Sequence, residues 1–197
     1  MITPPFLKKG DLIRIVAPAA RVSREALDYS INLLRSKGYE VETGQYMFGE
    51  SHSYLAGKDH ERLADLQSAL SQPSVRAVLC ARGGYGVTRI VDQINLDVLV
   101  QSPKWVVGFS DMTALHFSIL RKGVKSIHGT MPKLFAEDDD QSLNSLFDCL
   151  NGRCAELVAG KNKFNITGLA SGIIVGGNLS LIASCIGTHS EPDLHGR

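Results

Sequence analysis

The strongest constraint on the fold comes from residues 104–116, KWVVGFSDMTALH. The run Trp105–Phe109 is apolar without alternation, which is typical of a strand buried on both faces of a parallel sheet. It leads directly into Ser110 and a helix predicted over Asp111–Arg121. A serine at such a strand end resembles a nucleophile elbow, although Met112 stands where G-x-S-x-G has its second glycine. Serine is also a preferred helix N-cap, and this stretch alone favours the cap.

The rest of the chain predicts the architecture. Further strands are predicted over 11–17, 39–42, 75–81 and 124–128, and helices from Ser23, from Asp59 and over Val87–Ile94. This alternation is typical of an α/β fold, so we expect an open, mostly parallel sheet flanked by helices over residues 1–160. Later, an apolar strand (169–175) and a short apolar segment (179–186) cannot bury their own faces. We therefore expect residues 165–197 to begin a second domain whose remainder is absent.

A glycine-rich loop, Arg82–Gly86 (RGGYG), follows the strand predicted over 75–81. Glycines between a strand and a helix let backbone N–H groups approach a phosphate, a carboxylate or an oxyanion. The loop matches neither G-x-G-x-x-G nor the P-loop, and a tight turn without a ligand is an equally good interpretation. Ligands of open parallel sheets bind beyond the carboxyl ends of the strands, where this loop and Ser110 both fall.

Composition limits the classes of function. The 197 residues are 44% hydrophobic with a net charge of +1, which indicates a globular protein without the basic surface that nucleic acid requires. No apolar stretch is long enough to span a membrane, and the first ten residues do not resemble a signal peptide. The cysteines (Cys80, Cys149, Cys154 and Cys185) have no metal-ligand spacing, so we expect reduced thiols in a cytoplasmic protein. Cys80, beside the glycine loop, fits a small buried side chain better than a nucleophile.

Five motifs together resemble the LD-carboxypeptidase family of serine peptidases. The family includes muramoyl-tetrapeptide carboxypeptidases and the self-immunity peptidases that act on microcin C-type antibiotics. The motifs, in the family's order, are IVAP (15–18), RGGYG (82–86), GFSD (108–111) with Thr113, HG (128–129) and GGNL (176–179).

The resemblance implies a Ser–His–Glu triad whose serine is Ser110, which makes the nucleophile the dominant interpretation. It implies that the backbone N–H groups of Asp111 and Gly84 stabilise the oxyanion. It implies neither a metal nor an organic cofactor. The substrate-binding positions that it suggests are Gly83, Tyr85, His128 and Asn178.

The family's His and Glu lie beyond the end of this chain, and a serine without a positioned base is a poor nucleophile. His128, at a strand end, is the best substitute base, whereas His116 is expected to be packed. The remaining histidines are expected to be solvated: His52, His60, His189 and His195.

The resemblance implies hydrolysis of the bond between an L-centre and a terminal D-alanine of murein tetrapeptide, in cytoplasmic peptidoglycan recycling, by a homodimer. From the net charge and the lack of a long apolar stretch we expect neither a nucleic-acid nor a membrane partner. We expect the 197-residue chain alone to be nearly inactive. One alternative substrate is a peptidyl-nucleotide antibiotic. Another alternative is a non-catalytic module in which the glycine loop and Ser110 hold a carboxylate or peptide.

Overall fold

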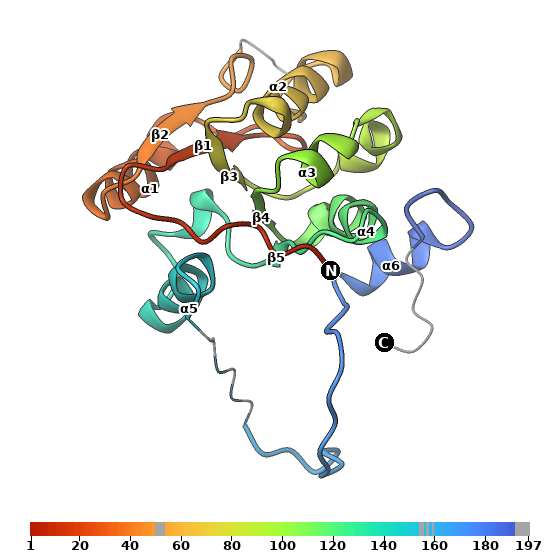
Figure 1. The fold of residues 1–197 in the computed structure, drawn as a ribbon. Coiled ribbons are helices and arrows are strands. Elements are labelled where there is room, and N and C mark those ends of the chain that lie inside the picture. Colours follow the sequence, from red (N-terminus) through yellow and green to blue (C-terminus); the bar gives the residue numbers. More distant parts are fainter. Residues whose placement is uncertain (50–53, 154–155, 157, 159, 192–197) are drawn as a thin grey trace.

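A computed structural model describes residues 1–49, 54–153, 156, 158 and 160–191. Five parallel strands form one sheet in the order β2-β1-β3-β4-β5 (Figure 1). The sheet confirms the predicted α/β class, and β4 occupies the predicted apolar run. The strands are β1 (Leu12–Val16), β2 (Glu40–Thr43), β3 (Val75–Cys80), β4 (Trp105–Gly108) and β5 (Ile127–His128).

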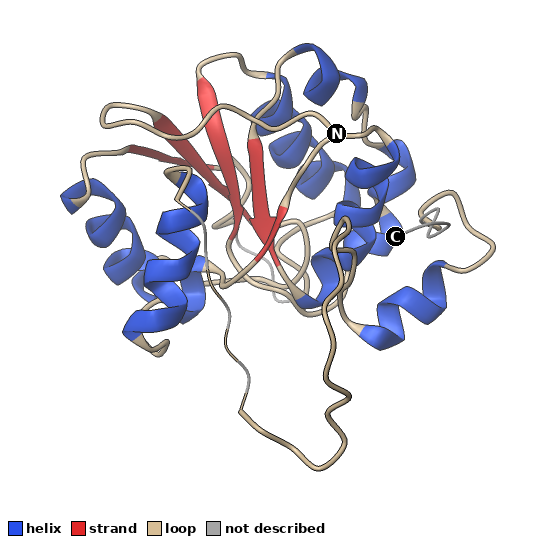
Figure 2. Ribbon diagram, turned by 60° about the horizontal axis from the view of Figure 1, so that its bottom comes forward, coloured by secondary structure: helices blue, strands red, loops and turns tan. Residues whose placement is uncertain are grey.

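Helices cover both faces of the sheet, as Figures 1 and 2 show. One face packs against α1 and α5, and the other packs against α2, α3 and α4. The bounds are α1 (Glu25–Ser36), α2 (Asp59–Ser71), α3 (Asp97–Gln101), α4 (Thr113–Arg121) and α5 (Asp140–Leu150). The N-cap residue of α1 is Arg24 rather than the predicted Ser23, although Ser23 Oγ accepts a hydrogen bond from Ala26 N at 3.3 Å.

The two apolar layers explain why β4 shows no alternation in its sequence. Trp105 and Val107 point into the layer under α1 and α5, whereas Val106 points into the layer under α2 and α4. Every residue of β4 is buried. A strand with helices on both sides needs apolar side chains at every position.

The helix predicted over Val87–Ile94 is wrong. Two short 3-10 turns, η1 (Val87–Arg89) and η2 (Val91–Gln93), occupy that segment and break at Ile90. Four of its residues are β-branched and buried, and β-branched side chains lose rotamer freedom in an α-helix. The buried contacts of Val87, Ile90 and Val91 are kept without a continuous helix.

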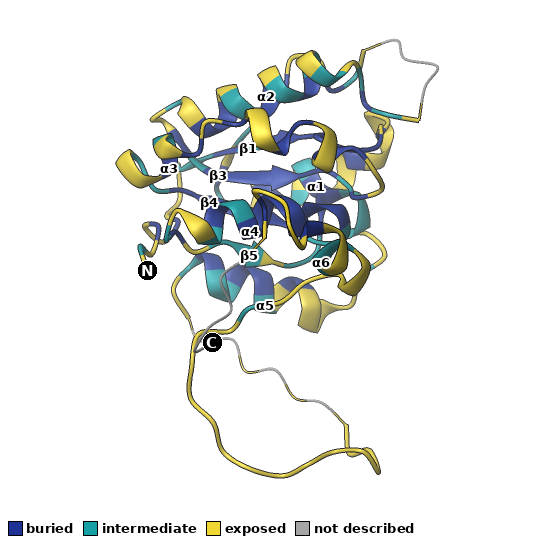
Figure 3. Ribbon diagram, turned by 90° about the vertical axis from the view of Figure 1, so that its right-hand side faces the viewer, coloured by how far each residue is buried: buried dark blue, intermediate teal, exposed yellow. Residues whose placement is uncertain are grey.

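The strand predicted over 169–175 is also wrong. Residues 160–177 leave the body of the protein as a long exposed excursion that contains no strand in its described part (Figures 2 and 3). Leu169 is 101% exposed and Ile174 is 98% exposed. A strand requires a hydrogen-bonded neighbour, and no other described segment pairs with this excursion. The chain then returns to pack α6 (Leu179–Cys185) against α4.

Across the described residues, we find no helix that combines the length and the apolar character needed to cross a membrane.

Candidate active site

The candidate site lies where β4 ends. Ser110 follows Gly108 and Phe109 and has a φ of +61°, the only positive φ of a non-glycine residue in the described part of the chain. A left-handed backbone at a residue with a Cβ costs about 1–2 kcal/mol, so the surrounding structure must hold it in place. A strained serine between a buried strand and a helix is the geometry of a nucleophile elbow.

The elbow is tight and does not use the serine side chain as a helix cap. A Cβ on Gly108 would lie 2.6 Å from Met112 Cγ, so the turn leaves no room for a larger residue. The Ser110 side chain makes no cap hydrogen bond; instead, Thr113 Oγ1 donates to the Ser110 carbonyl oxygen at 2.7 Å. The capping interpretation of the Ser110 side chain is therefore wrong, and the hydroxyl is left for another role.

The glycine loop lies directly against this serine. A Cβ built on Gly83 would be 3.2 Å from Ser110 Cβ and 3.5 Å from Ser110 Oγ. Gly84 has a φ of +116°, and a side chain there would meet the Tyr54 hydroxyl and the Ala20 methyl group. The structure thus brings the loop and the serine together, as the sequence predicted. The assignment of the Gly84 and Asp111 N–H groups as oxyanion donors stays a prediction.

The other predicted substrate-binding residues, His128, Asn178 and Tyr85, lie on three different elements around this elbow. His128 is paired with Gly108 in the sheet, and its ring centroid lies 6.2 Å from that of Phe109. Asn178 caps α6, since its side-chain oxygen accepts from Leu181 N at 3.2 Å. Its own N–H donates to Thr113 Oγ1 at 3.0 Å, which ties the returning chain to the elbow helix. Tyr85 is exposed at the tip of the glycine loop.

Within the described part of the chain, no histidine forms a hydrogen bond with the Ser110 hydroxyl. His116 is packed, as predicted: its Nδ1 lies 2.8 Å from Ser126 Oγ and its Nε2 lies 2.8 Å from the Gly108 oxygen. Burial lowers the pKa of His116 to about 4, and desolvation lowers the pKa of His128. His60 is exposed on α2. The predictions for His52, His195 and Cys154 fall outside the described residues.

Cysteine and metal chemistry find no support near this site. Cys80 is fully buried, and desolvation raises the pKa of its thiol to about 12, so it is not a thiolate nucleophile. The described residues contain no group of three or more His, Cys, Asp or Glu side chains arranged to hold a metal ion.

Two buried charged side chains next to the loop were missed by the sequence reasoning. Arg62 of α2 is 2% exposed and donates from Nη1 to the carbonyl oxygens of Pro18 and Gly86. The carboxylate of Asp111, also 2% exposed, accepts from Val87 N at 2.8 Å. Arg62 lies four residues before Leu66, one helical turn along the same face of α2. That spacing was the signal in the sequence that Arg62 lies on the buried face.

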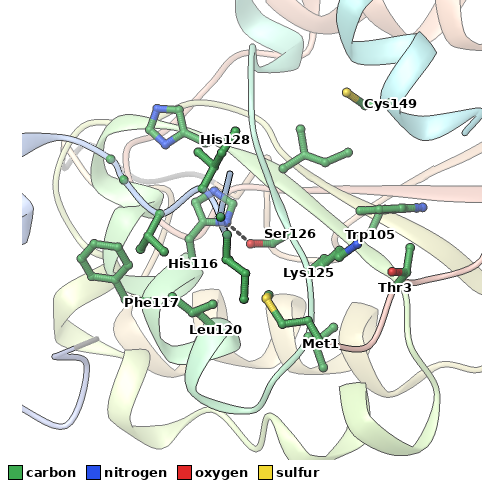
Figure 4. Close-up of a pocket in the computed structure, with 18 of the residues that line it drawn as sticks. Met1, Thr3, Trp105, His116, Phe117, Leu120, Lys125, Ser126, His128 and Cys149 are labelled. Atoms are coloured by element: carbon green, nitrogen blue, oxygen red, sulfur yellow. Dashed lines mark hydrogen bonds between the residues drawn. The ribbon is translucent and has the colours of Figure 1, made fainter. Parts of the chain in front are cut away.

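A separate apolar groove of about 1050 Å³ runs along the free edge of β5 (Figure 4). His116, Ser126 and His128 line it on one side, and residues 172–177 of the excursion line another. Ser110 and the glycine loop are not among its described lining residues. The groove therefore adjoins the candidate site without containing the serine.

Comparison with known proteins gives this geometry a context. Residues 13–129 match the LD-carboxypeptidase N-terminal domain. A probable murein peptide carboxypeptidase of Bacillus subtilis is 36% identical over 98% of this chain and 62% of its own length. The crystal structure of muramoyltetrapeptide carboxypeptidase from Oxalobacter formigenes superposes with a TM-score of 0.81 at 31% identity, over 92% of this chain and 62% of that one.

The fold extends to more distant proteins. The microcin C7 self immunity protein MccF, in complex with aspartyl sulfamoyl adenosine, has a TM-score of 0.84 at 18% identity, over 98% of this chain and 68% of that one. Our chain thus spans about three fifths of the length of the murein peptide carboxypeptidases that it matches. The matched domain covers more than half of the chain and includes the glycine loop and the elbow. The chain therefore belongs to the LD-carboxypeptidase family.

Proposed function

We propose that the protein containing this chain is a serine-type LD-carboxypeptidase that releases D-alanine from murein tetrapeptide. The single observation that carries the proposal is the strained Ser110 at the end of β4 with the glycine loop packed against its side chain. The names of the relatives at 31% and 36% identity support a murein peptide as the substrate.

In this mechanism, Ser110 Oγ attacks the carbonyl carbon of the scissile bond and forms a tetrahedral intermediate. The backbone N–H groups of Asp111 and Gly84 would stabilise the oxyanion, an interaction worth about 3–4 kcal/mol for each donor in comparable sites. A histidine oriented by a glutamate would take the serine proton and pass it to the leaving D-alanine. We infer that both residues come from a region that the family has and this chain does not contain.

The domain organisation is part of the same proposal. Residues 165–197 would begin a second domain that carries the histidine and the glutamate. The fully exposed apolar side chains of Leu169 and Ile174 support this inference, because such side chains are normally covered by other parts of a protein. A cytoplasmic location and a homodimeric state are further proposals that rest on the family resemblance.

The test is to incubate the native protein with murein tetrapeptide and to measure the D-alanine released. Ser110→Ala should lower kcat by about 10⁴-fold or more, as loss of a serine nucleophile does in comparable enzymes. Ser118→Ala, on α4, is the matched control and should retain activity, because among the described residues the Ser118 hydroxyl bonds Ala114 O and Ser190 Oγ and nothing at the elbow. Undiminished release by Ser110→Ala, or none by the native protein, would contradict the proposal.

A second candidate substrate is a peptidyl-nucleotide, which the similarity to the MccF fold favours. Competition between murein tetrapeptide and a nucleotide-bearing peptide would separate the two. The murein proposal predicts that the tetrapeptide has the higher kcat/KM. A preference for the nucleotide-bearing peptide would favour the second candidate.

The 197-residue chain on its own is expected to release little or no D-alanine, because no base is positioned beside Ser110 in its described part. Robust release that Ser110→Ala abolishes would contradict the requirement for a base from outside this chain.

A further inference from the structure

One peptide group of the glycine loop is held at both of its polar atoms by buried charged side chains. The carbonyl oxygen of Gly86 accepts a hydrogen bond from Arg62 Nη1 at 2.9 Å. The N–H of the same peptide, on Val87, donates to Asp111 Oδ2 at 2.8 Å. A guanidinium from α2 and a carboxylate from the elbow thus hold the Gly86–Val87 peptide from opposite sides.

The guanidinium is itself held in place by neighbours on two sides. Arg62 Nη1 also bonds the Pro18 carbonyl oxygen at the end of β1, and Nη2 pairs with the carboxylate of Asp59. Asp59 in turn receives three hydrogen bonds of 2.8–3.0 Å from Arg89, which lies in η1 just after the loop. A buried charge is tolerated only when it is paired and hydrogen-bonded, and this network satisfies that condition for most of the guanidinium.

We propose that Arg62 and Asp111 are positioning residues that fix the glycine loop against Ser110 and so set the spacing of the two oxyanion donors. The inference rests on the proposed function. Asp111 is central because its backbone N–H is one proposed donor while its side chain holds the loop that carries the other.

The loop needs such a clamp because its own sequence cannot make it rigid. Gly83, Gly84 and Gly86 lack the Cβ that restricts backbone rotation, and two of them have a positive φ. Larger side chains are excluded, since a Cβ on Gly83 would crowd Ser110 and one on Gly86 would lie 2.9 Å from Arg62 Nη1. Rigidity must therefore come from side chains outside the loop. Preorganised donors lose much of their effect if they shift by about 1 Å.

The first arm of the test measures kcat and KM for D-alanine release by the native protein and its variants. Arg62→Met should lower kcat by about 10- to 100-fold and change KM by less than about 3-fold, because the donors act on the transition state. Arg62→Lys, which keeps the charge, should recover part of the loss. Arg14→Met is the matched control: Arg14 also pairs with a carboxylate, that of Glu42, and its other side-chain hydrogen bond among the described residues goes to Ser68, outside the loop. It should lower thermal stability while leaving kcat unchanged.

A double-mutant cycle tests whether the two residues act on the same peptide. Asp111→Ala removes the acceptor of Val87 N–H and should resemble Arg62→Met, whereas Asp111→Asn keeps an acceptor and should lose less. The Arg62→Met/Asp111→Ala double variant should lose clearly less than the product of the single losses. A kcat within 2-fold of the parent in Arg62→Met, an equal loss in Arg14→Met, or losses that multiply in the double variant would overturn the proposal.

The second arm needs no turnover and separates this inference from the proposed function. Hydrogen exchange of the Val87 and Gly84 amides should accelerate at least about 10-fold in Arg62→Met relative to the parent, and less in Arg62→Lys, while amides of β1 stay unchanged. Unchanged exchange at both amides would overturn the clamp. If the native protein released no D-alanine, the proposed function would fail, and the exchange of these amides would still decide whether the clamp exists.

Discussion

Two runs of this chain, residues 105–108 and residues 169–175, are both mainly apolar but have different structures. The first is a buried strand between β3 and β5, with helices on both faces. The second is an exposed excursion in which Leu169 and Ile174 are almost fully exposed, while Val175 at its end packs against the core. The comparison shows that an apolar run becomes a strand only where neighbouring strands supply hydrogen bonds and apolar cover. The buried run belongs to the part of the chain that forms the candidate site. The exposed run belongs to the part that we infer is covered by the rest of a second domain.

The largest difference between the two regions should appear in a matched pair of leucine substitutions. Leu79→Ala in β3 removes a fully buried side chain and should lower the free energy of unfolding by about 2–5 kcal/mol. Leu169→Ala should change it by no more than about 0.5 kcal/mol. Urea unfolding followed by circular dichroism measures both. A loss above 1 kcal/mol in Leu169→Ala would show that the excursion is packed in solution.

Acid should destabilise the buried region through His116. Its pKa is about 4 in the folded protein and about 6.5 when unfolded, so between these values the unfolded state binds a proton that the folded state does not. The free energy of unfolding should therefore have its full value above pH 6.5 and fall by about 3 kcal/mol as the pH approaches 4. Unfolding curves from pH 7 to pH 4 test this. His116→Gln should flatten the profile, whereas the exposed His60→Gln should not; equal profiles in the two variants would contradict the assignment.

A pair of glycine substitutions gives the smallest expected difference in the free energy of unfolding. Gly108→Ala places a Cβ 2.6 Å from Met112 Cγ and 3.2 Å from Cys80 Cβ, and should cost about 1–3 kcal/mol. Gly172→Ala meets nothing within 4 Å and should be neutral within about 0.5 kcal/mol. Differential scanning calorimetry compares the two. A neutral Gly108→Ala would mean that the elbow is looser than the structure shows.

The sequence predicted much of the fold because most strands are apolar runs bounded by clear turn signals. It also predicted that Ser110 and the glycine loop meet, because both follow parallel strands and so lie at the same edge of the sheet. The spacing of Arg62 could indicate a buried side chain, but not its hydrogen bonds, which reach carbonyl groups 24 and 44 residues away. Nor could the sequence predict that 169–175 lacks a strand, because local apolar character does not reveal whether a neighbouring strand is present.

The central claim is that Ser110 is the nucleophile of a peptidase. The most direct measurement is to react the native protein with a fluorophosphonate probe and to map the adduct by peptide mass spectrometry. We predict one adduct, on Ser110, whose formation abolishes D-alanine release in proportion to labelling. Continued hydrolysis of murein tetrapeptide with Ser110 fully labelled, or with the adduct on another residue and Ser110 unmodified, would contradict the claim.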